Sequence, residues 1–207
     1  MSKNKIYLLK HLKHISKFLF VFIISYNYIF AQENDMFKSC LILNFKTGYH
    51  TGYKSDQNDG FPGGLIFDGS FSYGLTKLML IGVNLEFWNK KNVYKPNIKG
   101  LDIYAFGYGL NCILRKSFFK ILNIYFGAGV GNYSINRKND VPGENIKKNY
   151  LNLYLIFGSD IKVYKNLFLT ADCNLTGLLG EIDFGGNKSN PAFISFKIGP
   201  TFLFKIP

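Results

Sequence analysis

The chain has 207 residues, a formal net charge of +12 and 17% aromatic residues. This length fits one domain, and the positive charge lies in no helix or arginine-rich strip, which argues against nucleic acid as a partner. The three cysteines, Cys40, Cys112 and Cys173, are odd in number and widely spaced, which argues against a disulfide framework. Their spacing fits no metal site, and only one histidine follows residue 31, so we expect no metal and no cofactor.

The first 31 residues have the pattern of an export signal. Five lysines and no acidic residue lie within residues 1–17, and residues 18–24 (FLFVFII) are wholly apolar. Ala31 is a small residue that precedes a polar stretch. This order is typical of a cleaved secretory signal peptide, and the apolar run is too short for a membrane-spanning helix, which needs about 20 residues. We expect residues 1–31 to be removed on export and residues 32–207 to form the mature domain.

After residue 32, apolar and polar residues alternate in segments of roughly a dozen residues, separated by clusters of turn-forming residues. A period of two is typical of β-strands with one apolar face. The pattern predicts eight strands, at residues 38–49, 64–75, 78–88, 101–115, 121–135, 150–163, 167–178 and 192–204.

Short and long connections alternate along these predicted strands. The short links are residues 75–78, 115–121 and 163–167, and the long links are residues 50–63, 89–100, 136–149 and 179–191. Transmembrane barrels have this asymmetry, with short turns at the periplasmic end and longer loops outside. An even number of strands places the start of the first strand and the end of the last strand on the short-turn side.

Side-chain size predicts which face of each strand points outward. In residues 101–115, one face carries bulky groups such as Phe106 and Tyr108, and the other carries Gly107 and Gly109. An eight-stranded barrel has room inside only for packed side chains or one small ligand. We therefore expect the bulky apolar face to meet lipid and the small and polar face to line the interior.

The expected interior face carries eight charged residues, four of each sign. They are Lys46, Asp68, Glu86, Arg115, Asp160, Lys162, Asp172 and Lys197. Balanced charge is expected in a low-dielectric interior, because an unpaired buried ion costs several kcal/mol. Asp172 and Lys197 lie at matching heights of neighbouring strands, and we expect them to pair. Paired charges of this kind would plug the lumen.

Aromatic residues also gather near the ends of the predicted strands, which favours two girdles at the lipid–water boundaries. The long-loop end has Tyr49, Phe87, Trp88, Tyr104, Tyr133 and Tyr150. The short-turn end has Tyr73, Phe118, Phe119, Tyr164, Phe202 and Phe204.

The segments FISFKIGPTFLF, YAFGYGL and IYFGAGVG, together with the rhythm of the connections, resemble the small eight-stranded outer-membrane barrels, the OmpA/OmpX/OmpW-like group. The resemblance covers residues 38–204. It implies an all-β, eight-stranded, antiparallel up-and-down transmembrane β-barrel in a bacterial outer membrane.

Few residues suggest chemistry. Gly127, Gly129 and Gly131 have the spacing of a phosphate-binding loop, but no helix follows them, so we interpret them as small residues that make room inside the barrel. His50 is the one histidine after residue 31, and we expect it to be a solvated loop residue and not a general base. Enzymatic activity is therefore not expected.

The predicted loop at residues 89–100 is strongly basic. It contains Lys90, Lys91, Lys95 and Lys99 and no acidic residue. These lysines either contact phosphate groups of outer-leaflet glycolipid or form an ordinary solvated loop. The expected partners are thus outer-membrane lipid and glycolipid, with an extracellular or envelope protein as a further candidate.

Three functional classes fit this sequence. The first is a non-enzymatic outer-membrane barrel with a structural, surface-interaction or adhesion role and an interior plugged by paired charges. The second is a narrow porin or conduit for small solutes. The third is an outer-membrane enzyme or a secretion-assembly factor. Resolved channel steps in a planar bilayer would favour the second class.

Overall fold

A computed structural model describes most of residues 32–207. The described residues are 37–53, 63–95, 98–118, 121–138, 146–180, 182–183, 188–189 and 192–206. They belong to one compact unit, residues 35–207. The expected signal peptide lies outside the described residues, as does Phe119. Among the described residues, no helix is long and apolar enough to cross a membrane.

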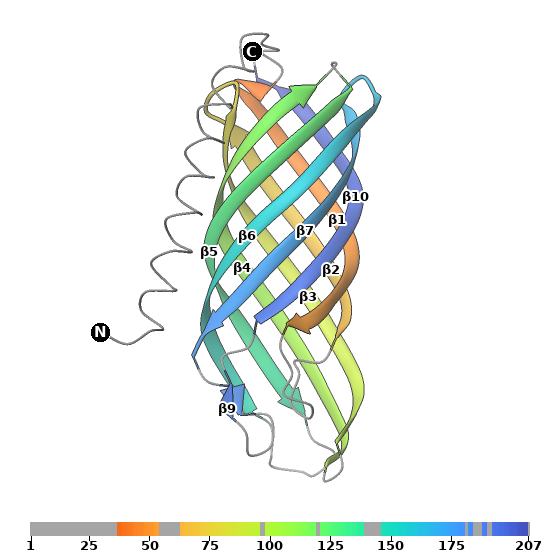
Figure 1. The fold of residues 1–207 in the computed structure, drawn as a ribbon, viewed down its shortest axis with the longest axis vertical. Helices are drawn as coiled ribbons and strands as arrows, with labels where there is room; N and C mark the ends of the chain where they lie inside the picture. The colour runs from red at the N-terminus through yellow and green to blue at the C-terminus, as the bar shows by residue number, and fades with distance from the viewer. Residues whose placement is uncertain are drawn as a thin grey trace, which may run out of the picture. The chain divides into compact units, whose positions relative to one another are not determined.

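Eight strands close into one antiparallel barrel (Figure 1). They are β1 (Cys40–Tyr53), β2 (Gly64–Gly74), β3 (Met79–Lys95), β4 (Ile98–Phe118), β5 (Leu122–Lys138), β6 (Ile146–Tyr164), β7 (Leu167–Leu179) and β10 (Ala192–Lys205). Each strand pairs with its neighbour in the chain, and β1 pairs with β10 to close the wall. The predicted eight-stranded up-and-down barrel is confirmed. A closed wall leaves no sheet edge within the barrel, which is what a lipid environment requires.

The bulky apolar side chains lie on the outside of this barrel. Phe106, Tyr108 and Leu110 are 46%, 53% and 63% exposed, while Gly107 and Gly109 on the same strand are buried. The same alternation holds along β2, β7 and β10. An outer surface of this composition is stable only against hydrocarbon, so the wall is a transmembrane one. The prediction from side-chain size is confirmed.

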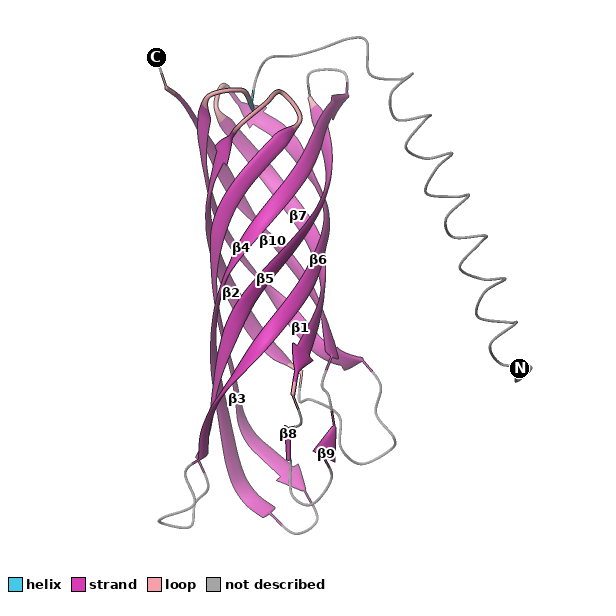
Figure 2. Cartoon of the chain, turned by 90° about the vertical axis from the view of Figure 1, so that its left-hand side faces the viewer, coloured by secondary structure: helices cyan, strands magenta, loops and turns pink. Residues whose placement is uncertain are grey.

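The short connections lie together at one end of the barrel. Residues 75–78 join β2 to β3, and the side-chain oxygen of Thr76 accepts hydrogen bonds from the N–H groups of Leu78 and Met79. The start of β1 and the end of β10 lie there too, because Ser39 N–H donates to the Gly74 carbonyl and Ile206 N–H donates to the Ser39 carbonyl. Figure 2 shows the C-terminus at the same end as these turns. The predicted placement of the start of the first strand and the end of the last strand on the short-turn side is confirmed.

Two of the predicted long loops contain the ends of long strands. Residues 89–100 were expected to be a loop, but β3 runs to Lys95 and β4 begins at Ile98. Residues 136–149 were also expected to be a loop, but β5 runs to Lys138 and β6 begins at Ile146. Polar and charged residues pair here as readily as apolar ones, because both faces of these strand ends lie beyond the apolar band. Figure 2 shows the strand ends extending past the rest of the barrel.

The last predicted loop, residues 179–191, also contains strand. β8 (Ile182–Asp183) and β9 (Lys188–Ser189) pair with each other as a separate two-stranded sheet. Pairing of only two residues on each side leaves no alternation that the sequence could reveal.

Interior glycines make room for tyrosine rings on the next strand. The opposed pairs are Gly107 with Tyr133, Gly129 with Tyr154, and Gly158 with Tyr125. A Cβ atom at Gly129 would lie 2.2 Å from Cζ of Tyr154 and 2.5 Å from the carbonyl oxygen of Leu110. Only glycine fits this position without movement of the ring and the neighbouring backbone.

Replacement of Gly129 by alanine is therefore expected to destabilise the barrel by about 1–3 kcal/mol, the usual cost of overpacking. The free energy of unfolding is measured by urea titration in lipid vesicles. Gly177→Ala is the matched control, because a Cβ atom there meets nothing within 4 Å. Equal stability of the two variants would contradict the role given to Gly129.

Candidate functional site

Five charged side chains from five strands meet inside the barrel. Lys46 of β1, Asp68 of β2 and Glu86 of β3 form one row, because Lys46 is the register partner of Asp68, and Asp68 that of Glu86. Asp172 of β7 and Lys197 of β10 form a second pair of register partners. We call these five residues the central cluster. Their side chains are at most 8% exposed.

The two lysines of the central cluster bridge all three carboxylates. Lys197 Nζ lies 2.7 Å from Glu86 Oε1 and 2.8 Å from Asp68 Oδ2. Lys46 Nζ lies 2.5 Å from Asp172 Oδ2 and 3.3 Å from Asp68 Oδ1. Each ammonium group therefore has two carboxylates within 3.3 Å, which compensates the charges where water is scarce.

The expected pair of Asp172 and Lys197 is present in the register, but it is the longest contact of the cluster. Lys197 Nζ is 4.0 Å from Asp172 Oδ1, while Asp172 is closer to Lys46. The lysine side chains also extend to carboxylates on strands that are not neighbours in the wall. The position of a residue along its strand does not predict which carboxylate its side chain contacts.

The other three predicted interior charges lie elsewhere. Arg115 and Asp160 form a separate buried pair, with Arg115 Nη2 3.1 Å from Asp160 Oδ2. Thr170 donates a 2.6 Å hydrogen bond to Asp160 Oδ1. Lys162 lies half-buried close to the turn that follows β6. The eight predicted residues thus form a cluster of five, a pair and a half-buried lysine.

Tyrosine hydroxyls complete the central cluster. Tyr133 donates to Glu86 Oε2, and Tyr125 donates a 3.2 Å hydrogen bond to Asp172 Oδ2. Tyr154 donates a 2.6 Å hydrogen bond to Asn84 Oδ1. These hydrogen bonds were not predicted, although Tyr125 shares the inward parity of Gly127 and Gly129.

Two layers of buried apolar side chains lie on either side of the central cluster. The layer toward the long hairpins is Ile66, Trp88, Ile103, Ala105, Tyr133, Ile135, Tyr150, Leu178 and Phe193. The layer toward the short turns is Phe37, Cys40, Ile42, Leu80, Ile113, Tyr125, Tyr154, Ile156, Phe168 and Leu203. The expectation that Trp88, Tyr133 and Tyr150 belong to a lipid-facing girdle is therefore wrong, because all three point inward.

His50 is also buried and not a solvated loop residue. It lies in β1, with its ring centroid 4.4 Å from that of Trp88 and 5.5 Å from that of Phe193. The expectation of a solvated position is wrong because β1 continues to Tyr53. Among the described residues, no group of three histidine, cysteine, aspartate or glutamate side chains is arranged so that it could hold a metal ion.

Phe37 covers the lumen at the short-turn end. It is 2% exposed, and its ring lies 6.3 Å from that of Phe168 and 4.8 Å from Cζ of Arg115. A Cβ atom at Gly74 would lie 1.7 Å from the Phe37 carbonyl oxygen, so glycine is needed where this segment crosses β2. Ser39 adopts a left-handed φ of 54°, which turns the chain into β1.

Basic residues follow the projecting ends of β3 to β6. Lys90 is half-buried, and its strand β3 also contains Lys91 and Lys95. Lys99 lies near the start of β4. The side chains of Lys91, Lys95 and Lys99 lie outside the described part of the chain. A further exposed set, which was not predicted as a site, is Lys138, Lys147 and Lys148.

Comparison with known proteins identifies the fold. No family model and no curated protein matches the chain. Neisserial surface protein A is similar, with a TM-score of 0.59 and 16% identity over 78% of this chain and 96% of that chain. OprG, an outer membrane protein from Pseudomonas aeruginosa, has a TM-score of 0.59 and 12% identity over 84% of this chain and 100% of that chain. The N-terminal β-barrel domain of Pseudomonas aeruginosa OprF has a TM-score of 0.51 and 16% identity over 81% and 98%.

The class of protein follows from these likenesses and from the apolar exterior. The chain is a transmembrane β-barrel. Its architecture is that of small eight-stranded barrels of bacterial outer membranes, and the expected outer-membrane location agrees with it.

Lys197→Met is expected to lower the free energy of unfolding by about 3–5 kcal/mol, because it leaves buried carboxylates with one lysine in place of two. Lys162→Met makes the same change at a half-buried position and is expected to cost much less. Urea titration of both variants in vesicles measures the difference. Similar losses would contradict the importance of the central cluster.

Phe37→Ala is expected to expose the buried thiol of Cys40. With Cys112 and Cys173 replaced by alanine, a membrane-impermeant maleimide should label Cys40 about tenfold faster in the variant. This factor corresponds to a decrease of about 1.4 kcal/mol in the free energy needed to expose the thiol. Phe71→Ala, at a lipid-facing phenylalanine of β2, is the control and should leave the rate unchanged. Equally fast labelling of Cys40 in the protein that keeps Phe37 would contradict the proposal that Phe37 covers this end of the lumen.

Proposed function

We propose that this barrel acts at the cell surface as a non-enzymatic interaction or adhesion protein with a closed lumen. The observation that carries the proposal is the sheet formed by the projecting ends of β3, β4, β5 and β6. β2 begins its pairing with β3 at Leu65 and Asn89, but β3 pairs with β4 as far as Lys95. A rigid sheet beyond the membrane is a suitable platform for a partner.

The other side of the sheet has the same offset. β6 pairs with β7 only from Leu151, yet it pairs with β5 from Ile146. Lys147, Lys148 and Asn149 are consecutive and all exposed, so both faces of the sheet meet solvent there. In the barrel wall, by contrast, alternate residues are buried.

The charge of this projecting sheet supports an anionic partner. Lys138 of β5 lies opposite Asp102 of β4, and its Nζ is 5.6 Å from the ring centroid of Tyr104. Among the described residues of these strand ends, Asp102 is the one acid, against Lys90, Lys138, Lys147 and Lys148, so the positive charge is in excess. Phosphate groups of outer-leaflet glycolipid are the partner that this charge favours, because charge-assisted hydrogen bonds to phosphate are strong.

The interior supports a closed lumen over the alternative of a narrow porin. The central cluster lies between two layers of buried apolar side chains, and its lysines join strands that are not neighbours in the wall. Packed apolar layers of this kind favour a closed lumen over a water-filled path for polar solutes. The packing of His50 against Trp88 and Phe193 likewise favours a structural role for the histidine over use as a general base.

Loss of the basic residues at the long-hairpin end is expected to weaken glycolipid binding about tenfold or more, since each 1.4 kcal/mol is a factor of ten. The test variant replaces four lysines with serine, at Lys90, Lys91, Lys95 and Lys99. The control variant makes the same change at the short-turn end, at Lys38, Lys116, Lys165 and Lys205. Calorimetry with bisphosphorylated and dephosphorylated lipopolysaccharide measures affinity. Equal affinity of the two variants would overturn the glycolipid partner.

Planar-bilayer recordings test the closed lumen separately. The purified barrel is expected to give no resolved channel steps. Steps that appear with the unmodified protein would favour the porin alternative and leave the glycolipid measurement unaffected.

A further inference from the structure

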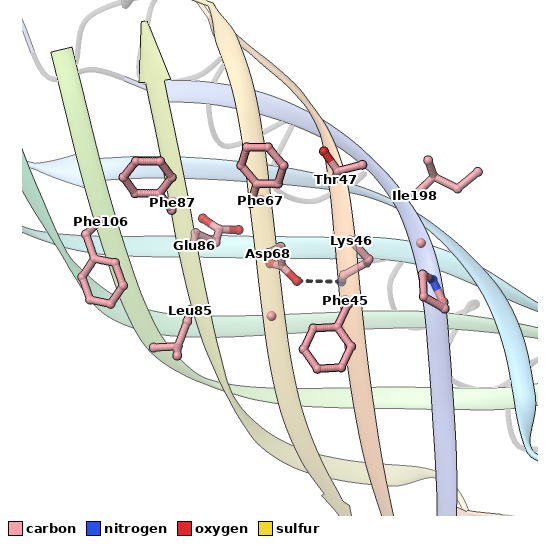
Figure 3. Close-up of a pocket in the computed structure, with 13 residues that line it drawn as sticks. Phe45, Lys46, Thr47, Phe67, Asp68, Leu85, Glu86, Phe87, Phe106 and Ile198 are labelled. Carbon is pink, nitrogen blue, oxygen red and sulfur yellow. Dashed lines mark ion pairs between the residues drawn. The ribbon is translucent and has the colours of Figure 1, made fainter. Parts of the chain in front are cut away.

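A depression opens on the lipid-facing surface over β1, β2 and β3, with β10 and β4 at its sides, and it has a volume of about 480 Å³. Figure 3 shows the bulky side chains that surround it. Its apolar walls are Phe45, Phe67, Leu85, Phe87, Phe106 and Ile198. The volume falls within the range of small-molecule sites in proteins, about 300–1,000 Å³.

The depression exists because a glycine stands where the neighbouring outward positions carry large side chains. Gly69 points outward between Phe67 and Phe71 of the same strand. Its register partners are Phe45 of β1 and Leu85 of β3, which are 57% and 52% exposed. A Cβ atom at Gly69 would meet nothing within 4 Å. We call this depression the Gly69 notch.

The polar groups around the Gly69 notch already have partners. Asp68 and Glu86 point to the interior, where both contact Lys197. The Thr47 hydroxyl donates a 3.2 Å hydrogen bond to the Ile66 carbonyl. An occupant is therefore held by apolar contact and by shape.

The level of the Gly69 notch within the membrane limits which molecules can reach it. Gly69 is the middle residue of β2 (Gly64–Gly74), next to Asp68 of the central cluster. In a membrane whose apolar band is about 25 Å tall, this level lies in the hydrocarbon core, beyond the reach of lipid headgroups. An empty notch would forfeit the dispersion contacts of its walls, so hydrocarbon is expected to fill it.

We propose that the Gly69 notch binds one acyl chain of an outer-membrane lipid as a resident ligand. The notch is continuous with the lipid-facing surface of the barrel, so lipid chains are its immediate neighbours. Aromatic rings on several sides give a chain more contacts than the convex wall elsewhere. The bound chain exchanges more slowly than the other chains around the barrel.

Electron paramagnetic resonance can count such chains. Barrels are reconstituted in phosphatidylcholine vesicles that contain a trace of phosphatidylcholine spin-labelled near the end of one acyl chain. Gly69→Phe fills the notch and is expected to remove one motionally restricted chain per barrel. Gly177→Phe is the matched control, because it adds the same ring at an outward glycine that also has open space around its Cβ position. It should keep the number found for the unmodified barrel.

Two results would overturn the proposal. The first is an equal number of restricted chains in the unmodified barrel and in Gly69→Phe. The second is a dimer of the unmodified barrel, seen by cross-linking in vesicles, that Gly69→Phe converts to monomers, because a second copy would then occupy the notch. Heat-modifiable migration on a denaturing gel verifies folding of each variant, and Gly69→Leu replaces Gly69→Phe if the larger side chain prevents folding.

Discussion

The ammonium group of Lys197 lies within 4.0 Å of three carboxylates deep inside the barrel, and much of the interior is arranged around this contact. A buried ion is tolerated only if its partners are close and their remaining hydrogen-bonding capacity is used. Lys46 supplies the second cation, and the hydroxyls of Tyr125 and Tyr133 supply further donors. The wall must then place these groups at one level on strands that are far apart in the chain.

The positions of these groups also depend on glycines in the barrel wall. Tyr133 donates to Glu86 while its ring lies over Gly107 of the neighbouring strand. A larger residue at Gly107 would displace the ring and with it the hydroxyl. The small residues on the inner face are therefore coupled to the ionic contacts, even though they carry no polar side chain themselves.

Much of the fold could be predicted from the period of two and from side-chain size. A short turn also fixes the register of the hairpin that it closes, which is why Asp68 and Glu86 end up opposite each other across residues 75–78. The register between Lys46 and Asp68 depends on a long connection, so their pairing could not be derived. His50 and Trp88 could have been placed inside, because they share the parity of Lys46 and Glu86. The projecting strand ends were missed for a different reason: where both faces meet water, alternation disappears and lysine-rich strand resembles loop.

The closing pair of strands has a consequence for how the chain folds. Cys40 pairs with Lys205, so β1 and β10 meet across nearly the whole barrel sequence, whereas most other strand pairs are local hairpins. The central cluster takes residues from both chain ends, which leaves Lys197 without Glu86 and Asp68 until β10 joins β1. Contacts of such long sequence separation form late and slowly. An unfinished barrel would expose both an open edge and uncompensated ions to lipid, so insertion and closure are expected to occur as one cooperative event, with the last strand as the step that sets its rate.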